Sequence, residues 1–238
     1  MLLYYVRHGD PIYDPDSLTP LGKRQAEAVA KRLARYGLDE IYVSSSQRAK
    51  ETARPTCEIL KMEPVELDWA NEGHAWRDFS VDNGNGGKSW CFQLQPYRQL
   101  FCSEEMRKLD DNWYDHPKFR DFPFKPGFER IRDAADDFFA QQGYRHDRKE
   151  HIYISEKPND KRIAIFAHQG FGVLFLSSIL DVCVPQFVTH FDMCHSSVSV
   201  IEFKDIDGIT IPKALMLSND SHIYGEGLPT KYNNVIYI

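Results

Sequence analysis

Short apolar runs alternate with helical patterns along this chain, and that alternation constrains its fold more than any other feature. Residues 2–6, 40–44, 65–69 and 163–167 form short runs rich in branched and aromatic side chains, which predict strands. Most of these runs are followed by stretches with helical periodicity. Strands that alternate with helices favour an α/β domain, with a mainly parallel sheet and helices on both faces.

Caps and breakers mark the helices. Thr19 is expected to cap a helix that has Pro20 at its first position and stops at Gly37. A helix over residues 46–61 is expected to be disturbed by Pro55. Further predicted elements are helices at 126–142 and 170–180, and strands at 151–154, 198–203 and 209–217, the last two joined by a hairpin through 205–208.

Residues 73–126 interrupt this alternation with a glycine-rich run, several prolines and eleven aromatic side chains. One helix is expected near 100–109. We interpret the stretch as a helical or irregular cap inserted into a single domain that spans residues 1–238. Most of its aromatic side chains are expected to form a core of its own. The candidates for substrate specificity in it are Trp76, Trp90, Trp113, Arg77, Lys88 and Arg98.

Composition narrows the class of protein. The net charge of −6 gives no reason to expect binding to nucleic acid or to an anionic membrane. The five cysteines lack CxxC spacing, which favours free thiols in a reducing compartment. The apolar run 2–6 leads straight into Arg7, without the basic flank of a signal peptide, and the apolar stretch 171–180 is too short to span a bilayer. We therefore expect a cytoplasmic protein.

Polar side chains follow four of the predicted strands where each strand ends. Arg7 and His8 follow the first strand, Arg48 the second, Glu72 the third, and His168 the strand over 163–167. In open parallel sheets these ends face one crevice, which is where ligands bind. Two arginines, two histidines and one carboxylate are therefore expected to converge there.

This combination of residues fits the chemistry of a phosphate ester. Guanidinium groups match phosphate oxygens, and free backbone N–H groups after His168 can point at an anion. Neutral His8 can attack phosphorus, and a nearby carboxylic acid can protonate the departing alkoxide. Arginine charges remove the need for a metal, and the other histidines show no clustered ligand spacing, so no metal or cofactor is expected.

Each of these residues alone has an ordinary explanation. An arginine after a strand is usually a solvated surface charge, and a histidine such as His168 is more often structural than functional. Glu72 alone could be a loop carboxylate. The prediction therefore depends on the conjunction of the residues at corresponding strand ends.

At these positions the sequence resembles the histidine phosphatase superfamily, in its phosphoglycerate-mutase-like branch. The family motifs are matched by Arg7-His8-Gly9, by Thr19-Pro20-Leu21-Gly22 with Gln25-Ala26, by Ser44-Ser45 with Arg48-Ala49 and Thr52-Ala53, and by Ala167-His168-Gln169-Gly170. Gln169 follows the second histidine where the acid phosphatase branch has aspartate. The matches cover roughly the first sixty residues and the stretch 163–180.

The resemblance implies a role for each matched residue. It implies that His8 is the nucleophile, and that Arg7, Arg48 and His168 hold the phosphate. His168 also counts among the catalytic residues. Glu72 is implied to be the proton donor, with Asp10 as the competing acid.

The predicted activity is metal-independent hydrolysis of small phosphate monoesters through a phosphohistidine on His8. Residues 10–15 replace the Asn- and Trp-rich segment of true mutases, which favours hydrolysis, and a cofactor-dependent phosphoglycerate mutase is the alternative. A second alternative is a non-catalytic protein that binds phosphorylated ligands, although such a protein would normally lack the nucleophile or an arginine. His222 is a further candidate to approach the site.

Overall fold

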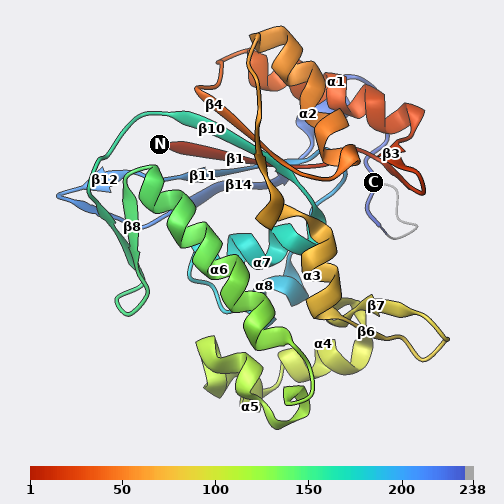
Figure 1. Cartoon of the computed structure of the whole chain (residues 1–238), viewed down its shortest axis with the longest axis vertical. Helices are drawn as coiled ribbons and strands as arrows, with labels where there is room; N and C mark the ends of the chain where they lie inside the picture. The colour runs from red at the N-terminus through yellow and green to blue at the C-terminus, as the bar shows by residue number, and fades with distance from the viewer. Residues whose placement is uncertain (234–238) are drawn as a thin grey trace.

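The computed structural model describes residues 1–233, and its main element is a six-stranded sheet (Figure 1). The strands in spatial order are β14 (Lys213–Asn219), β11 (Val198–Glu202), β1 (Leu2–Arg7), β10 (Arg162–Ala167), β4 (Glu40–Ser44) and β5 (Val65–Leu67). β1, β10, β4 and β5 run parallel, whereas β11 pairs antiparallel with both β1 and β14. The predicted mainly parallel α/β sheet is confirmed.

Helices cover both faces of this sheet, and the strand side chains alternate between them (Figure 1). Leu3 and Tyr5 of β1 belong to a large core that includes side chains of α6 (Phe124–Gln141) and α7 (Gln169–Ile179). Val6 belongs to a second core, under α1 (Pro20–Ala34) and α2 (Gln47–Leu60). Because both faces are covered, β1 and β10 are apolar at nearly every position.

The start of α1 agrees with the prediction. The Thr19 side-chain oxygen accepts a hydrogen bond from the Gly22 N–H at 3.0 Å, and Pro20 stands in the first turn. The helix ends at Ala34, three residues before Gly37, which has a φ of 72°.

The disturbance predicted at Pro55 is wrong, because α2 runs through this residue without a break. Ala49, Ala53 and Cys57 recur at every fourth position and are buried against the sheet. This packing outweighs the one backbone hydrogen bond that the proline removes. The strand predicted over 65–69 is shorter, because residues 68–70 form a 3₁₀ turn.

The stretch from residue 73 to 126 contains several short elements. They are most of α3 (Glu72–Phe79), β6 (Ser80–Asp82), β7 (Lys88–Trp90), α4 (Gln95–Phe101), α5 (Glu104–Leu109) and the start of α6. The helix predicted near 100–109 is divided in two, because Ser103 caps α5 by accepting a hydrogen bond from the Met106 N–H. Trp113 is 1% exposed and contacts the rings of Phe101 and Phe119, as expected for a core residue. A single domain with an inserted cap stays a prediction.

A second sheet flanks the first and contains β12 (Asp205–Ile206), β13 (Ile209–Thr210), β9 (Ile152–Ser155) and β8 (Tyr144–Asp147). The predicted turn at 205–208 joins β12 to β13, but the strand predicted over 209–217 is divided between β13 and β14. Pro212, which lacks an N–H, lies between the two pieces. The remaining elements are β2 (Pro11–Tyr13), β3 (Asp16–Leu18), α8 (Val184–His190) and α9 (Ser221–Gly225). Within residues 1–233, no helix combines the length and the apolar character needed to cross a lipid bilayer.

Two glycines of the sequence motifs let the loop after β1 approach α1. A Cβ atom at Gly9 would lie 2.6 Å from the Gly22 carbonyl oxygen, and a Cβ at Gly22 would lie 2.3 Å from the Asp10 carbonyl oxygen. Both distances are shorter than carbon and oxygen atoms tolerate without bonding. The contact therefore needs glycine on both sides, and it sets where the chain leaves the sheet after His8.

We expect Gly22→Ala to lower the free energy of unfolding by about 1–3 kcal/mol, the usual cost of overpacking. Helix propensity alone predicts the opposite sign, a gain of about 1 kcal/mol. Gly225→Ala is the matched control, because it also lies in a helix and a Cβ there would meet nothing within 4 Å. Urea denaturation followed by circular dichroism compares the two variants. A Gly22→Ala protein as stable as the wild type would contradict the close approach.

Candidate active site

Two histidines lie side by side because of the parallel register between β1 and β10. Arg7 pairs with Ala167 in this ladder, so His8 and His168, the next residues on each strand, meet beyond its end. Their ring centroids are 5.2 Å apart. The His8 N–H donates to the Ala167 carbonyl oxygen at 2.9 Å, and the Tyr5 hydroxyl donates to the His168 carbonyl oxygen at 2.6 Å. Both backbones are therefore held in place.

The side chain of His8 is oriented by its own loop. Nδ1 lies 2.7 Å from the Gly9 carbonyl oxygen, which can only accept, so Nδ1 carries the hydrogen and Nε2 keeps its lone pair. Burial, followed by the charges of His168, Arg7 and Arg48, lowers the pKa of His8 well below 6.5. The ring is therefore neutral at neutral pH, and Nε2 is a free base.

His168 is held by the serines that follow β4. Its Nε2 lies 2.8 Å from Ser44 Oγ and 3.3 Å from Ser46 Oγ. Burial lowers the pKa of His168 to about 4, in spite of the Glu72 carboxylate, whose Oε2 lies 3.6 Å from Nδ1. When Nε2 accepts the Ser44 hydroxyl hydrogen, Nδ1 carries the ring hydrogen and becomes a donor.

Glu72 and Arg48 meet across the start of two helices. Arg48 Nη2 donates to Glu72 Oε2 at 3.0 Å, while Nη1 donates to Asp16 Oδ1 at 2.9 Å. The other oxygen of Glu72 accepts the Gly170 N–H at 2.8 Å, at the positive end of α7. Burial acts to raise the pKa of Glu72, but His168, Arg48 and this N–H outweigh it and hold the pKa below its usual value.

Arg7 is buried without a carboxylate in direct contact. Nη1 donates to the Met193 carbonyl oxygen and Nη2 donates to Asn233 Oδ1, and both acceptors are neutral. Burial therefore lowers the pKa of Arg7, although the guanidinium remains charged. The charge of Arg7 is thus less compensated than that of Arg48, which is paired with two carboxylates.

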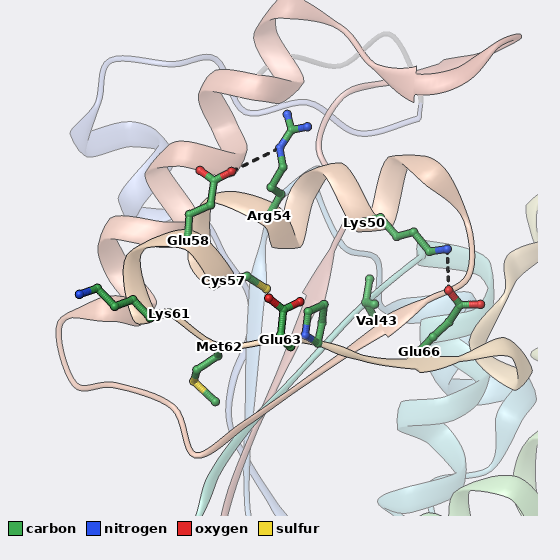
Figure 2. A pocket seen from close by; sticks show the side chains of 10 residues that line it. Val43, Lys50, Arg54, Cys57, Glu58, Lys61, Met62, Glu63 and Glu66 are labelled. Atoms are coloured by element: carbon green, nitrogen blue, oxygen red, sulfur yellow. Dashed lines mark ion pairs between the residues drawn. The ribbon is translucent and has the colours of Figure 1, made fainter.

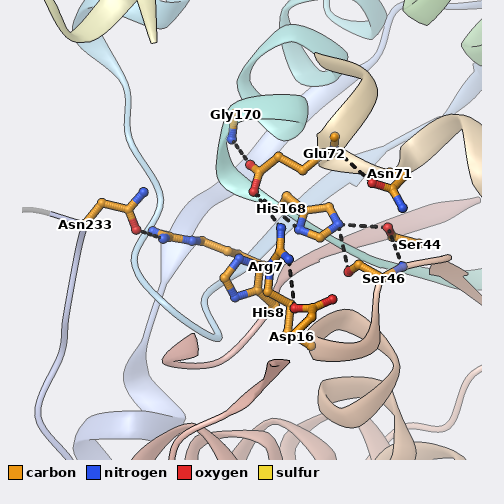
Figure 3. A network of polar contacts seen from close by, with 12 residues as sticks. Arg7, His8, Asp16, Ser44, Ser46, Asn71, Glu72, His168, Gly170 and Asn233 are labelled. Carbon is orange, nitrogen blue, oxygen red and sulfur yellow. Dashed lines mark hydrogen bonds and ion pairs between the residues drawn. The ribbon is translucent and has the colours of Figure 1, made fainter. Parts of the chain in front are cut away.

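Three donor atoms in this cluster are buried and have no hydrogen-bond partner within residues 1–233: Nε of Arg7, Nε of Arg48 and Nδ1 of His168. Figure 3 shows the side chains of Arg7 and His168 beside those of His8 and Glu72. Each unsatisfied buried donor costs about 1–3 kcal/mol, so such a group of donors marks the place of an absent acceptor. An anion with several oxygens, such as phosphate, has the acceptors that this place lacks.

The same cluster contains atoms that could ligate a metal. His8, Glu72 and His168 offer donor atoms that lie within 4.8 Å of one another. Two guanidinium groups border this position, and Arg48 already binds the carboxylate. Their positive charges oppose a metal cation and favour an anion.

The sequence of residues 3–76 matches the model of the histidine phosphatase superfamily, branch 1. The matched stretch contains Arg7, His8, Arg48 and Glu72 of the cluster. None of the curated proteins matches the chain.

Solved structures of low sequence identity share the fold of this superfamily. A phosphoserine phosphatase from Entamoeba histolytica, in complex with 3-phosphoglyceric acid, has a TM-score of 0.59 at 15% identity, over 93% of this chain and 98% of that one. An alpha-ribazole phosphatase from Shigella flexneri has a TM-score of 0.56 at 18% identity, over 92% and 97%. A mycobacterial glucosyl-3-phosphoglycerate phosphatase, complexed with VO3, has a TM-score of 0.57 at 17% identity, over 90% and 97%.

Asp10, which follows the Arg7-His8-Gly9 motif and competes with Glu72 as the acid, has other partners. Its Oδ2 accepts the Thr19 hydroxyl hydrogen at 2.8 Å, and Oδ1 lies 3.0 Å from Lys231 Nζ and 3.5 Å from His195 Nδ1. Asp10 thus connects the loop after β1 to Thr19, the N-cap residue of α1, and to the C-terminal segment. The contacts of Glu72, in contrast, are with Arg48, His168 and the start of α7, which favours Glu72 as the acid.

His222 lies elsewhere, on α9. Its Nε2 contacts the Ser196 carbonyl oxygen at 2.9 Å, and its Nδ1 contacts Arg32 of α1 at 3.0 Å. Burial is the largest cause that lowers its pKa to about 4. These contacts indicate that His222 fastens α9 to the loop before β11 and to α1.

A cavity of about 670 Å³ opens beside Arg48 and Glu72. Two of the specificity candidates, Trp76 and Trp90, line it together with Tyr13. The candidate cations are engaged elsewhere: Arg77 pairs with Asp78, and Arg98 donates to two backbone carbonyl oxygens. Lys88 is exposed on β7 and is not among the lining residues.

The sequence analysis missed two residues that complete the cluster, Asp16 and Asn233. Asp16 lies on the β2–β3 hairpin, whose strands of three residues each are too short to show a pattern. Asn233 reaches Arg7 from 226 positions along the chain, so no local spacing relates them.

A second hollow, of about 470 Å³, lies beside α2 and β5 (Figure 2). Four of its charged side chains are paired, with Lys50 Nζ 2.5 Å from Glu66 and Arg54 Nε 3.9 Å from Glu58, while Lys61 and Glu63 are exposed at its rim. Burial raises the pKa of Cys57 to about 11, so its thiol remains protonated. The residues that line this hollow therefore offer no activated nucleophile, and they do not bring two free cations together.

We expect inorganic phosphate to bind the cluster, and Arg48→Gln to weaken its affinity by about ten- to a hundredfold, the effect of losing hydrogen bonds to a charged group. Arg54→Gln is the matched control, because Arg54 lies on the same helix and is exposed in a different hollow. Isothermal titration calorimetry gives both dissociation constants. Equal affinities in the wild type and Arg48→Gln would show that the phosphate position is wrongly assigned.

Proposed function

We propose that the chain hydrolyses phosphate monoesters of small molecules through a phosphohistidine on His8. The observation that carries this proposal is the group of unpartnered donors on Arg7, Arg48 and His168, gathered beside the free Nε2 of His8. A phosphoryl group that satisfies these donors presents its phosphorus to the nucleophile. Phosphatases named for three different phosphorylated compounds are among the similar structures, which supports the same reaction class.

In the first step, Nε2 of His8 forms a bond to phosphorus and the bond from phosphorus to the leaving oxygen breaks. The electron pair stays with the leaving oxygen, which takes a proton from the Glu72 carboxylic acid. Arg7, Arg48 and His168 donate to the other phosphate oxygens and stabilise the charge on them. The Gly9 carbonyl oxygen, 2.7 Å from Nδ1, stabilises the positive ring of the phosphohistidine.

In the second step, water attacks the phosphohistidine and the bond from phosphorus to Nε2 breaks. The Glu72 carboxylate takes the proton of this water and is again an acid. Inorganic phosphate leaves, and His8 returns to its neutral form. The protonation states of both groups are therefore restored after one turnover.

Binding of the substrate causes Glu72 to take up its proton. Without the substrate, Arg48 and His168 hold the pKa of Glu72 low, which favours the carboxylate. A phosphate dianion beside Arg48 compensates this cation and adds negative charge near Glu72. Both changes raise the pKa of the carboxyl, so the acid forms when it is needed.

The proposal includes a cytoplasmic location and a substrate that is neither nucleic acid nor membrane lipid. All five cysteines are free thiols, which suits a reducing compartment. The net charge of −6 opposes the approach of a polyanion.

Rapid acid-free quenching during turnover of a ³²P-labelled monoester should trap an acid-labile, base-stable adduct on His8. His8→Ala should lose both the adduct and the activity, because no other group supplies the nucleophile. His190→Ala is the matched control, since His190 is an exposed histidine at the end of α8. Full activity in His8→Ala would refute the assignment of the nucleophile.

Glu72→Gln should lower turnover of alkyl phosphates by about a hundredfold, because an alkoxide leaving group needs a proton. Nitrophenyl phosphate should be affected much less, because nitrophenolate leaves as a stable anion. Steady-state kinetics on both substrates measures this difference, after circular dichroism has shown that the variant folds.

Asp10→Asn is the control for this leaving-group effect, because Asp10 contacts Thr19 and Lys231 instead of the cluster. This variant should change the turnover of alkyl phosphates and of nitrophenyl phosphate to the same extent. A selective loss on alkyl phosphates in Asp10→Asn, and not in Glu72→Gln, would transfer the acid role to Asp10.

A further inference from the structure

The proton donor shares a helix face with an exposed tryptophan. Glu72 and Trp76 are at positions i and i+4 of α3, so their side chains lie on the same face, one turn apart. Both line the cavity of about 670 Å³. A leaving group that takes its proton from Glu72 therefore extends into the cavity that Trp76 lines.

The ring of Trp76 packs on a buried side chain. It lies edge-to-face on Trp90, with centroids 5.0 Å apart and planes at 84°. Trp90 is 6% exposed, and it packs on Gly170 so closely that a Cβ there would lie 2.2 Å from its Cζ2. Trp76 itself is 37% exposed. One ring is thus fixed in place while part of its surface remains uncovered at the cavity.

A second aromatic ring lies next to the phosphate position. Tyr13, on the β2–β3 hairpin, is 62% exposed, and its ring centroid is 5.4 Å from the Arg48 guanidinium carbon. Since Arg48 also contacts Glu72, Tyr13 and Trp76 belong to the surroundings of one leaving group. Exposed aromatic rings with open surface are suited to stacking on a flat apolar ligand.

The charges around the cavity disfavour a leaving group that carries a negatively charged substituent. Among the described residues that line it, Arg48 is the single Lys or Arg, and it is paired with Asp16 and Glu72. With the substrate bound, Glu72 is the neutral acid, so a carboxylate on the leaving group would face the Asp16 carboxylate, and the described lining residues offer no cation besides Arg48. The cavity therefore favours a leaving group without negative charge.

We propose that this cavity binds the leaving group of phosphate monoesters that carry a flat aromatic ring and no second negative charge, and that Trp76 is a specificity-determining residue. The inference rests on the proposed function, since it names the substrate class of the same site. It sets this chain apart from a phosphatase whose substrate carries a carboxylate beside the phosphate.

The test compares kcat/KM for three alkyl phosphates that need the same protonation at the leaving oxygen: 2-phenylethyl phosphate, ethyl phosphate and 2-(4-carboxyphenyl)ethyl phosphate. For the wild type we expect 2-phenylethyl phosphate to exceed ethyl phosphate by about tenfold, which corresponds to the strength of one aromatic contact. We also expect it to exceed the carboxylated ester, because the carboxylate of that ester would face Asp16 without a further cation. In Trp76→Ala the ratio of 2-phenylethyl to ethyl phosphate should fall about tenfold, mainly through KM.

Two further variants control this comparison. Trp76→Phe should restore most of the preference, because the aromatic face returns. Tyr224→Ala, at a residue 84% exposed on α9, should leave all three values as in the wild type.

The outcomes separate the two proposals. Turnover of all three esters without a preference for the phenyl ring, or a preference that survives in Trp76→Ala, would overturn the substrate class and leave the phosphatase intact. A preference for the carboxylated ester would also overturn it. Absence of turnover on every ester, together with absence of a phosphohistidine, would refute the proposed function itself and the inference with it.

Discussion

The parallel pairing of β1 with β10 is the constraint on which the site depends. Because Arg7 is paired with Ala167, the next residues of both strands are histidines that meet at one edge of the sheet. A shift of one residue in this register would turn the strand side chains to the opposite faces and separate the two rings. The two separate cores, one with α1 and α2 and one with α6 and α7, oppose such a shift from both faces. The catalytic geometry is therefore stabilised by the same packing that stabilises the fold.

The electrostatics of the cluster depend on which groups are charged. The charged groups are two arginines and the two carboxylates paired with Arg48, those of Glu72 and Asp16, whereas burial is the main cause that keeps both His8 and His168 neutral. If the histidines were protonated as well, four positive groups would face these two carboxylates. Neutral rings reduce this repulsion, and they also supply the lone pair that a nucleophile needs. The same burial thus serves both stability and reactivity.

Sequence reasoning found the parts of the site that follow strand ends. Arg7, His8, Arg48 and His168 each follow a strand whose apolar character is visible, and a parallel sheet must bring such ends together. Glu72 was predicted as the proton donor from its place after the third strand and from the resemblance, with Asp10 as the competing acid, and its contacts with Arg48 and Gly170 support that choice.

Other residues could not be found this way. Asp16 and Asn233 reach the cluster through tertiary contacts with no local periodicity. The path of α2 through Pro55 was also wrongly predicted, because helix propensity is local and the packing that overrides it is not.

The contact between Trp90 and Gly170 ties the wall of the cavity to the chemistry. Gly170 supplies the N–H that holds Glu72, and its lack of a side chain makes room for the indole of Trp90. A replacement of Trp90 therefore alters the packing around the N–H that holds Glu72, the proposed proton donor, as well as the shape of the cavity. Trp76 is not among the atoms packed closest to Gly170, and it lines the open cavity instead. A substitution at position 76 can therefore change which leaving group fits the cavity while the N–H that holds Glu72 stays in place.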